Sequence, residues 1–161
     1  MHARGAGGAR GFTLIETLVV MALAAVLLAV AVPNLRPQVA AAHAKSTASQ
    51  LADALRYARQ YALNTSTLVT FTPSGCGYTV ATTAGTQLLS ASSGASSGVS
   101  CQALSQTVSF LGDGSVALCT QGAQGLSCSP AGANSTATVS GGGSNWQIVL
   151  SPGGVVTTSG S

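Results

Sequence analysis

The stretch that decides the fold is Gly11-Phe12-Thr13-Leu14-Ile15-Glu16, followed by an apolar run that continues to Val32. A helix over residues 12–32 is about 31 Å long, which matches the ~30 Å hydrocarbon core of a bilayer. Glu16 is the one charged residue in this segment. A charge at the centre of such a helix costs on the order of 2.5–3.5 kcal/mol in lipid. The segment is therefore a membrane-anchor candidate with one costly carboxylate.

Two interpretations of this N-terminus are open. In the first, Arg4 and Arg10 form the basic part of an ordinary secretory signal, and Ala29-Val30-Ala31 is its cleavage site. This interpretation gives Glu16 no role, and it does not use the helical pattern that continues beyond Pro33. It describes an exported small β-protein with no role in a filament, whose mature chain begins at Val32.

The second interpretation starts from the string 11–16, which resembles the prepilin-peptidase recognition motif of type IV pilins and pseudopilins. The resemblance implies that the leader 1–11 is removed between Gly11 and Phe12 and that the new N-terminal Phe12 is methylated. It also makes Glu16 the assembly residue, because its carboxylate can meet the α-amino group of Phe12 in a neighbouring subunit and so set the axial register. The alternative is that Glu16 extends to the lipid headgroups.

The helical pattern continues behind this anchor. Pro33 and Pro37 predict a kink or a short break. Beyond them, small and apolar residues recur at intervals of three and four, which is typical of one face of a helix. We therefore expect a long helix from Phe12 to about Leu63, with a transmembrane or filament-core segment over 12–35 and an amphipathic continuation over 36–65. The predicted buried positions are Ala44, Ala48, Leu51, Leu55, Ala58 and Ala62.

Residues 66–161 form the predicted head. Two-residue periodicity predicts strands at 67–72 and 78–82, a hairpin of 107–111 with 115–119, and a last hairpin of 145–150 with 155–158. The Ser, Gly and Ala-rich segments 83–100 and 120–144 are predicted to be loops. The fold class is α+β: a long N-terminal helix packed against a small antiparallel β-sheet or β-sandwich head.

This arrangement resembles the GspH/FimT-type branch of minor pilins. The resemblance rests on the sequence Val108-Ser109-Phe110-Leu111-Gly112-Asp113-Gly114, which looks like that branch's strand-turn motif. Some DNA-uptake members carry a Gly-Arg-x-Arg sequence in the closing hairpin. The matching stretch here is Gly153-Gly154-Val155-Val156, which has neither arginine.

Four cysteines, all in the head, predict two disulfides in an oxidising compartment. Four cysteines allow three pairings, and Cys76 with Cys101 and Cys119 with Cys128 are favoured because they close the shorter loops. A metal site is the alternative, but no C-x-x-C is present and His2 and His43 are far away in sequence. We predict no metal and no cofactor.

Charge excludes several classes of function. Asp113 is the one charged residue from Gln60 to Ser161, so the head carries no basic patch for a phosphate backbone. The head also has no histidine and no pair of carboxylates, so a hydrolytic triad or dyad is absent from it. Arg56 and Arg59, on the predicted helix, are expected to lie on a solvated face.

We therefore predict a non-enzymatic minor pilin or pseudopilin, a structural subunit of a type II secretion pseudopilus or type IV pilus. The alternative is a tip pilin that binds extracellular DNA during natural transformation. The resemblance implies three kinds of partner: other pilins through the N-terminal helix, the prepilin peptidase and the assembly platform. It also implies single-pass insertion in the inner membrane with a periplasmic head, before entry into a filament.

Overall fold

The structure is a computed structural model of the chain. It describes residues 12–92, 98–102, 104, 106–122 and 125–161, without the side chains of 30–34 and 121–126. The predicted leader, with Gly11, lies outside the described residues. The helix is α1 (Leu14–Thr65). The strands are β1 (Val69–Ser74), β2 (Gly77–Thr82), β3 (Gln87–Ala91), β4 (Val99–Gln102), β5 (Thr107–Phe110), β6 (Val116–Gly122), β7 (Gly125–Pro130), β8 (Ser135–Gly141), β9 (Ser144–Leu150) and β10 (Val156–Gly160).

The chain divides into two compact units, Met1–Arg36 and Pro37–Ser161. Helix α1 contributes to both, and it is helical without interruption through Pro33 and Pro37. The predicted extent of the helix is confirmed, whereas a break at the prolines is not observed. The boundary between the units nevertheless falls directly before Pro37.

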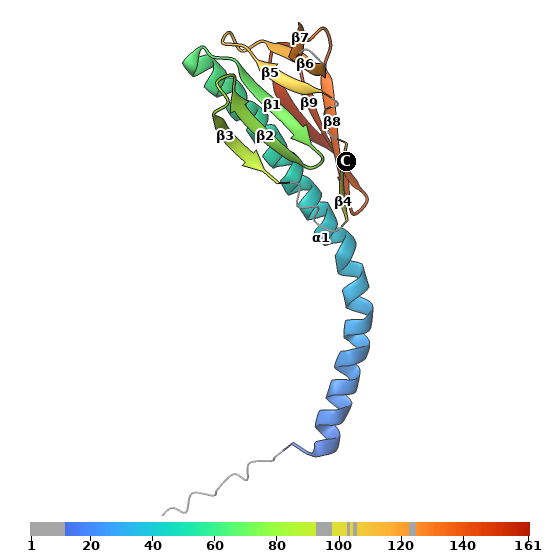
Figure 1. Ribbon diagram of the computed structural model, residues 1–161. Helices are drawn as coiled ribbons and strands as arrows, with labels where there is room; N and C mark the ends of the chain where they lie inside the picture. The colour runs from blue at the N-terminus through green and yellow to red at the C-terminus, as the bar shows by residue number, and fades with distance from the viewer. Residues whose placement is uncertain (1–11, 93–97, 103, 105, 123–124) are drawn as a thin grey trace, which may run out of the picture. The chain divides into compact units, whose positions relative to one another are not determined.

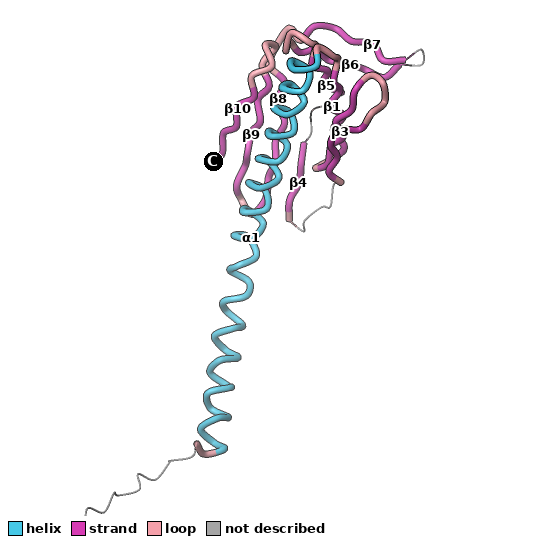
Figure 2. The backbone as a smooth tube through the Cα atoms, turned by 90° about the vertical axis from the view of Figure 1, so that its left-hand side faces the viewer, coloured by secondary structure: helices cyan, strands magenta, loops and turns pink. Residues whose placement is uncertain are grey.

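In the second unit the strands form two antiparallel sheets beside the C-terminal part of α1 (Figure 1). The six-stranded sheet has the order β3-β2-β1-β5-β6-β7, and the four-stranded sheet has the order β10-β9-β8-β4. Figure 2, turned by 90°, shows β8, β9 and β10 running along the helix. The predicted α+β class, with a helix packed on an antiparallel head, is confirmed.

The helix packs on the sheets through small side chains. Every position of the predicted stripe is buried, with Ala44, Ala58 and Ala62 at 0% exposure. These residues belong to one apolar cluster with residues of both sheets, including Phe71 on β1 and Ile148 on β9. Alanine lets a helix approach a sheet closely, so a few large residues complete this core.

All three predicted hairpins are present. They are β1 with β2, β5 with β6, and β9 with β10. The prediction that 83–100 and 120–144 are loops is wrong, because β3 and the start of β4 lie in the first segment and β7 and β8 in the second. Residues 93–97 and 123–124, within those segments, lie outside the described residues. Serine and threonine look like loop residues in composition, but here they cover the solvent face of sheets.

The β8–β9 connection shows why segment 120–144 is not a loop throughout. Gly142 and Gly143 have φ values of +59° and +84° and link the paired residues Gly141 and Ser144. Two successive residues with positive φ define the type I′ turn, whose twist matches that of an antiparallel hairpin. A Gly-Gly pair between Val139 and Trp146 was thus a hairpin signal that composition obscured.

Candidate processing and assembly site

Thr13 and Glu16 are coupled at the N-terminal end of α1. The main-chain N–H of Glu16 donates to Thr13 Oγ1 at 3.3 Å and to the Thr13 carbonyl at 3.1 Å. Thr13 therefore acts as the N-cap residue of the helix, and Glu16 occupies the third helical position. A carboxylate in the first turn is also favoured by the helix dipole. The Thr-x-x-Glu pattern of the capping box is the sequence signal that marks this helix start.

The helix that follows is apolar on all sides. Every side chain from Phe12 to Ala29 is exposed, including Phe12 at 80%, Leu14 at 80% and Met21 at 76%. A helix that is apolar all round is stable only where an apolar environment surrounds it. Lipid or the helices of other subunits can supply that environment.

Within the residues that the structure describes, no helix meets the combined requirements of length and apolar character for crossing a membrane.

Arg56 and Arg59 both donate hydrogen bonds to the head. Arg56 is exposed, as expected for a solvated helix face, whereas Arg59 is only partly exposed. Arg59 donates from Nη2 to the carbonyl of Gly153 at 3.1 Å and from Nε to that of Gly114 at 3.4 Å. Arg56 donates from Nη2 to the carbonyl of Val156 at 3.3 Å and from Nη1 to Asp53 Oδ1 at 2.8 Å. Both guanidinium groups thus form hydrogen bonds within the chain, and each bonds at least one main-chain carbonyl of the head.

The turn of the last hairpin is packed tightly beneath Arg59. Gly154 has φ +78°, and a Cβ atom there would lie 2.4 Å from the Gly114 carbonyl oxygen and 2.6 Å from Arg59 Nε. The N–H of Val116 on β6 donates to the Pro152 carbonyl at 3.0 Å. The two sheets therefore meet at this turn, against the last part of α1.

Asp113 is a turn residue, as the sequence indicates. Its Oδ1 accepts the Ser115 N–H at 2.8 Å and the Ser115 hydroxyl at 2.6 Å. The hydroxyl and then the N–H of Ser115 hold the pKa of this carboxyl below its ordinary value. Among the described residues, no group of three or more His, Cys, Asp or Glu side chains could hold a metal ion.

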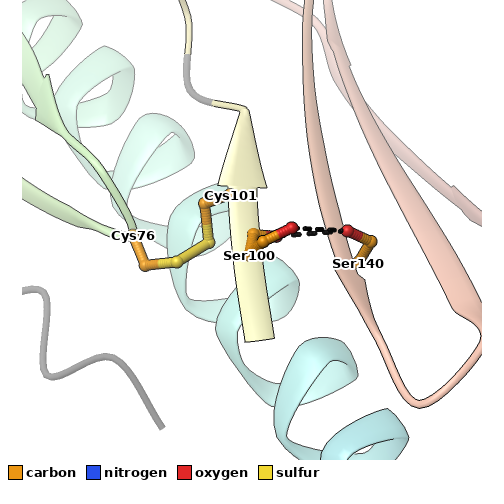
Figure 3. The surroundings of a disulfide bond; sticks show 4 residues. All are labelled: Cys76, Ser100, Cys101 and Ser140. Carbon is orange, nitrogen blue, oxygen red and sulfur yellow. Dashed lines mark hydrogen bonds between the residues drawn. A yellow bond between two sulfur atoms is a disulfide. The ribbon is translucent and has the colours of Figure 1, made fainter. Parts of the chain in front are cut away.

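Both disulfides of the structure follow the pairing favoured from the sequence. Cys76, in the β1–β2 turn, is bonded to Cys101 on β4, and Cys119 is bonded to Cys128 on the neighbouring strand. The first bond joins the two sheets (Figure 3). On the other side of β4, the hydroxyls of Ser100 and Ser140 are hydrogen bonded at 2.8 Å. Strand β4 is thus held from both flanks.

Comparison with known families gives two matches, one at the N-terminus and one over the C-terminal part of the helix and the head. A family model described as the prokaryotic N-terminal methylation motif matches residues 7–32, a range that contains Gly11, Phe12 and Glu16. A second, described as type II transport protein GspH, matches residues 47–160. No curated protein and no solved structure gave a significant match.

These matches define a prepilin-type chain: an N-terminal methylation motif and a helix that leads into an antiparallel β head. Prepilin-type proteins are membrane-anchored and become part of a pilus. The chain belongs to the GspH family of type II transport proteins. It is a minor pseudopilin or pilin, in a family that is structural, and nothing in the comparisons supports the DNA-binding alternative.

Proposed function

We propose that this chain is a structural, non-enzymatic subunit of a type II secretion pseudopilus. The observation that carries the proposal is the occurrence of the methylation motif at 7–32 together with the GspH match at 47–160 in one chain. The second match favours the secretion pseudopilus over the type IV pilus, because its family is described as a type II transport protein.

The proposed sequence of events begins in the inner membrane. The segment 12–35 anchors the precursor with its head in the periplasm, and the prepilin peptidase removes residues 1–11 by cutting between Gly11 and Phe12. The new amino group of Phe12 is then methylated. The uniformly exposed apolar side chains from Phe12 to Ala29 support an anchor that later packs among the helices of other pilins.

Glu16 is proposed to set the register of the subunit during assembly. Its carboxylate lies in the first turn of α1, four residues after Phe12, and is exposed. In an apolar filament core an unpaired carboxylate is costly, and the amino group of Phe12 from a neighbour is a cation of the right kind. The assembly platform then extracts the subunit from the membrane into the filament.

The test is complementation of a strain that lacks this chain. Secretion of a type II substrate and surface piliation are measured together, with the wild-type chain and the Glu16→Val variant. We expect the wild type to restore secretion, and Glu16→Val to reach the membrane at a normal level but not to restore it. Thr13→Val is the matched control, because it removes the N-cap hydroxyl and keeps the carboxylate.

The outcomes separate the alternatives. Thr13→Val should complement, since a cap contributes only about 1 kcal/mol to a helix of this length. If both variants fail equally, Glu16 acts through helix capping and not through register. If Glu16→Val complements fully, the register role is wrong. If restoration concerns piliation and not secretion, the chain belongs to a pilus instead.

A further inference from the structure

Strand β10 is the outer strand of the four-stranded sheet on the side away from β4 (Figure 2). Its pairing with β9 runs without a register shift from Val156 opposite Leu150 to Gly160 opposite Trp146. It continues at Ser161 and Asn145, which exchange two main-chain hydrogen bonds of 3.1 and 3.0 Å. Because bonded and non-bonded pairs alternate in an antiparallel ladder, Thr158 and Gly160 direct their N–H and C=O groups to the open edge.

The same alternation places the polar groups of Val156 on this edge. Its carbonyl oxygen accepts a hydrogen bond from Arg56 Nη2 at 3.3 Å. Beyond that point no hydrogen bond is found for the outward groups of Thr158 and Gly160 within the described part of the chain. The side chains of Thr157, Thr158 and Ser159 are exposed and uncharged. The edge is therefore closed at its first residue and open along the rest.

The other three edges differ from β10. Strand β3 carries a register shift opposite Val80 and Ala81. Strand β7 ends in Pro130, which has no N–H to offer. Strand β4 is bonded through Cys101 to the turn of the neighbouring sheet. Bulges, prolines and covering contacts are the devices that protect edges from pairing. In the described residues, β10 has such a protection only at Val156, where Arg56 covers the carbonyl.

We propose that the β10 edge is an interaction surface that accepts an extended strand from the head of a different pilin-type subunit. Alternating N–H and C=O groups at the spacing of a strand are complemented by an extended peptide backbone. The absence of charge on residues 157–160 favours a partner strand with uncharged side chains. This inference rests on the proposed function, which supplies neighbouring subunits.

Trp146 adds a preference for one apolar residue in the partner strand. A Cβ atom on Gly160 would lie 2.5 Å from Cε3 and Cζ3 of the indole, so the ring lies directly over the main chain of Gly160 at the edge. An aromatic ring over a cross-strand glycine replaces the side chain that the glycine lacks. A partner side chain opposite Gly160 would meet this ring.

A second copy of the same chain is not the expected occupant. Two β10 strands paired antiparallel are related by a two-fold axis. Since α1 runs along the strands of this sheet (Figure 2), such an axis would direct the two helices oppositely. Subunits anchored in one membrane or one filament have parallel helices, so the strand comes from a different subunit.

The experiment changes one outward N–H. Thr158→Pro removes this group without removing a bond to β9, whereas Thr158→Val keeps it and alters only the side chain. The full-length variants are produced in a strain lacking the chain, and the fraction recovered in sheared filaments is compared with the membrane level. We expect Thr158→Pro to lower that fraction about fivefold, as one interface hydrogen bond is worth about 1 kcal/mol. Thr158→Val should match the wild type.

Folding and function are controlled in the same strains. Resistance of the head to protease and the absence of free thiols verify that Thr158→Pro folds. Glu16→Val, measured alongside, separates the two proposals. If Glu16→Val abolishes recovery in filaments and folded Thr158→Pro does not lower it, the β10 proposal is wrong and the proposed function stands. If neither lowers recovery, the proposed function fails as well.

A photo-crosslinking residue at position 158 gives evidence that does not depend on the proline variant. The expected product joins this position to an extended head segment of another prepilin-type chain, identified by mass spectrometry. The matched control is the same residue at position 147, which is exposed on β9 and is paired on both sides, with β8 and with β10. No product, equal product from position 147, or a product with a second copy of this chain would overturn the proposal.

Discussion

Arg59 and Gly153 are joined by a hydrogen bond of 3.1 Å from the guanidinium Nη2 to the main-chain carbonyl. The donor lies near the C-terminal end of α1 and the acceptor in the β9–β10 turn, 94 residues later. Arg59 Nε also reaches the Gly114 carbonyl in the β5–β6 turn. One side chain of the helix thus bonds a turn from each sheet.

Arg59→Met keeps most of the packing of the side chain and removes its donors. We expect the free energy of unfolding of the head to fall by about 1–2 kcal/mol, because hydrogen bonds from a charged donor are worth more than neutral ones but this site is partly exposed. Chemical denaturation of the full chain in detergent measures the loss. Lys45→Met is the comparison, because it removes a cation that lies over the Trp146 ring. It should lower the free energy of unfolding by less than Arg59→Met does. Equal losses would contradict the role given to Arg59.

Gly154→Ala places a methyl group against the Gly114 carbonyl and Arg59 at a residue with φ +78°. Steric overlap and backbone strain together should lower the free energy of unfolding by roughly 2–4 kcal/mol. Gly153→Ala is the matched control, since a Cβ there meets nothing within 4 Å. Denaturation midpoints of the two variants make the comparison. A Gly154→Ala variant as stable as Gly153→Ala would show that the two turns do not meet as described.

The two disulfides should contribute unequally. Cys76–Cys101 closes a separation of 25 residues between two sheets, whereas Cys119–Cys128 closes 9 residues between strands already paired in a hairpin. Replacing both cysteines of the first pair by alanine should lower the free energy of unfolding by about 2–4 kcal/mol. The same replacement in the second pair should lower it by about 1 kcal/mol less. Mass mapping of an unreduced digest tests the pairing itself. Four free thiols in the exported protein would contradict it.

Asp113 should make the stability of the head depend on acid pH. Its pKa is lower in the folded chain because it accepts two hydrogen bonds from Ser115. The stabilisation is therefore complete above the unfolded pKa of about 4 and is lost as pH falls through the lower folded pKa. The wild type should lose more stability between pH 6 and pH 3 than Asp113→Ala. If the stability of the two proteins changed with pH in the same way, the role given to the Asp113 carboxylate would be wrong.

The helix was predictable because its evidence is local. Alanine and leucine at intervals of three and four define the buried face, and all six predicted positions are buried. Strand β8 is hard to recognise in the sequence. Its residues Thr136-Ala137-Thr138-Val139 alternate between threonine and buried apolar residues, but the serine and glycine around them are typical of a loop. The pairing of Arg56 with Asp53 is local, at i and i+3, and so could be predicted from the helical spacing. The partners of Arg56 and Arg59 in the head could not be predicted. They are main-chain carbonyls 55 to 100 residues away, and every residue has a carbonyl, so no sequence pattern marks them.

If this chain is a processed prepilin, its mature N-terminus shows this most directly. The protein is isolated from the membranes of its producing cells, and its intact mass and N-terminal sequence are determined. We predict a chain of 150 residues, the full 161 less the 11 of the leader, that begins with N-methylated Phe12. Gly11→Val should keep the leader. A mature chain that begins at Val32, or normal removal of the leader from Gly11→Val, would contradict the account.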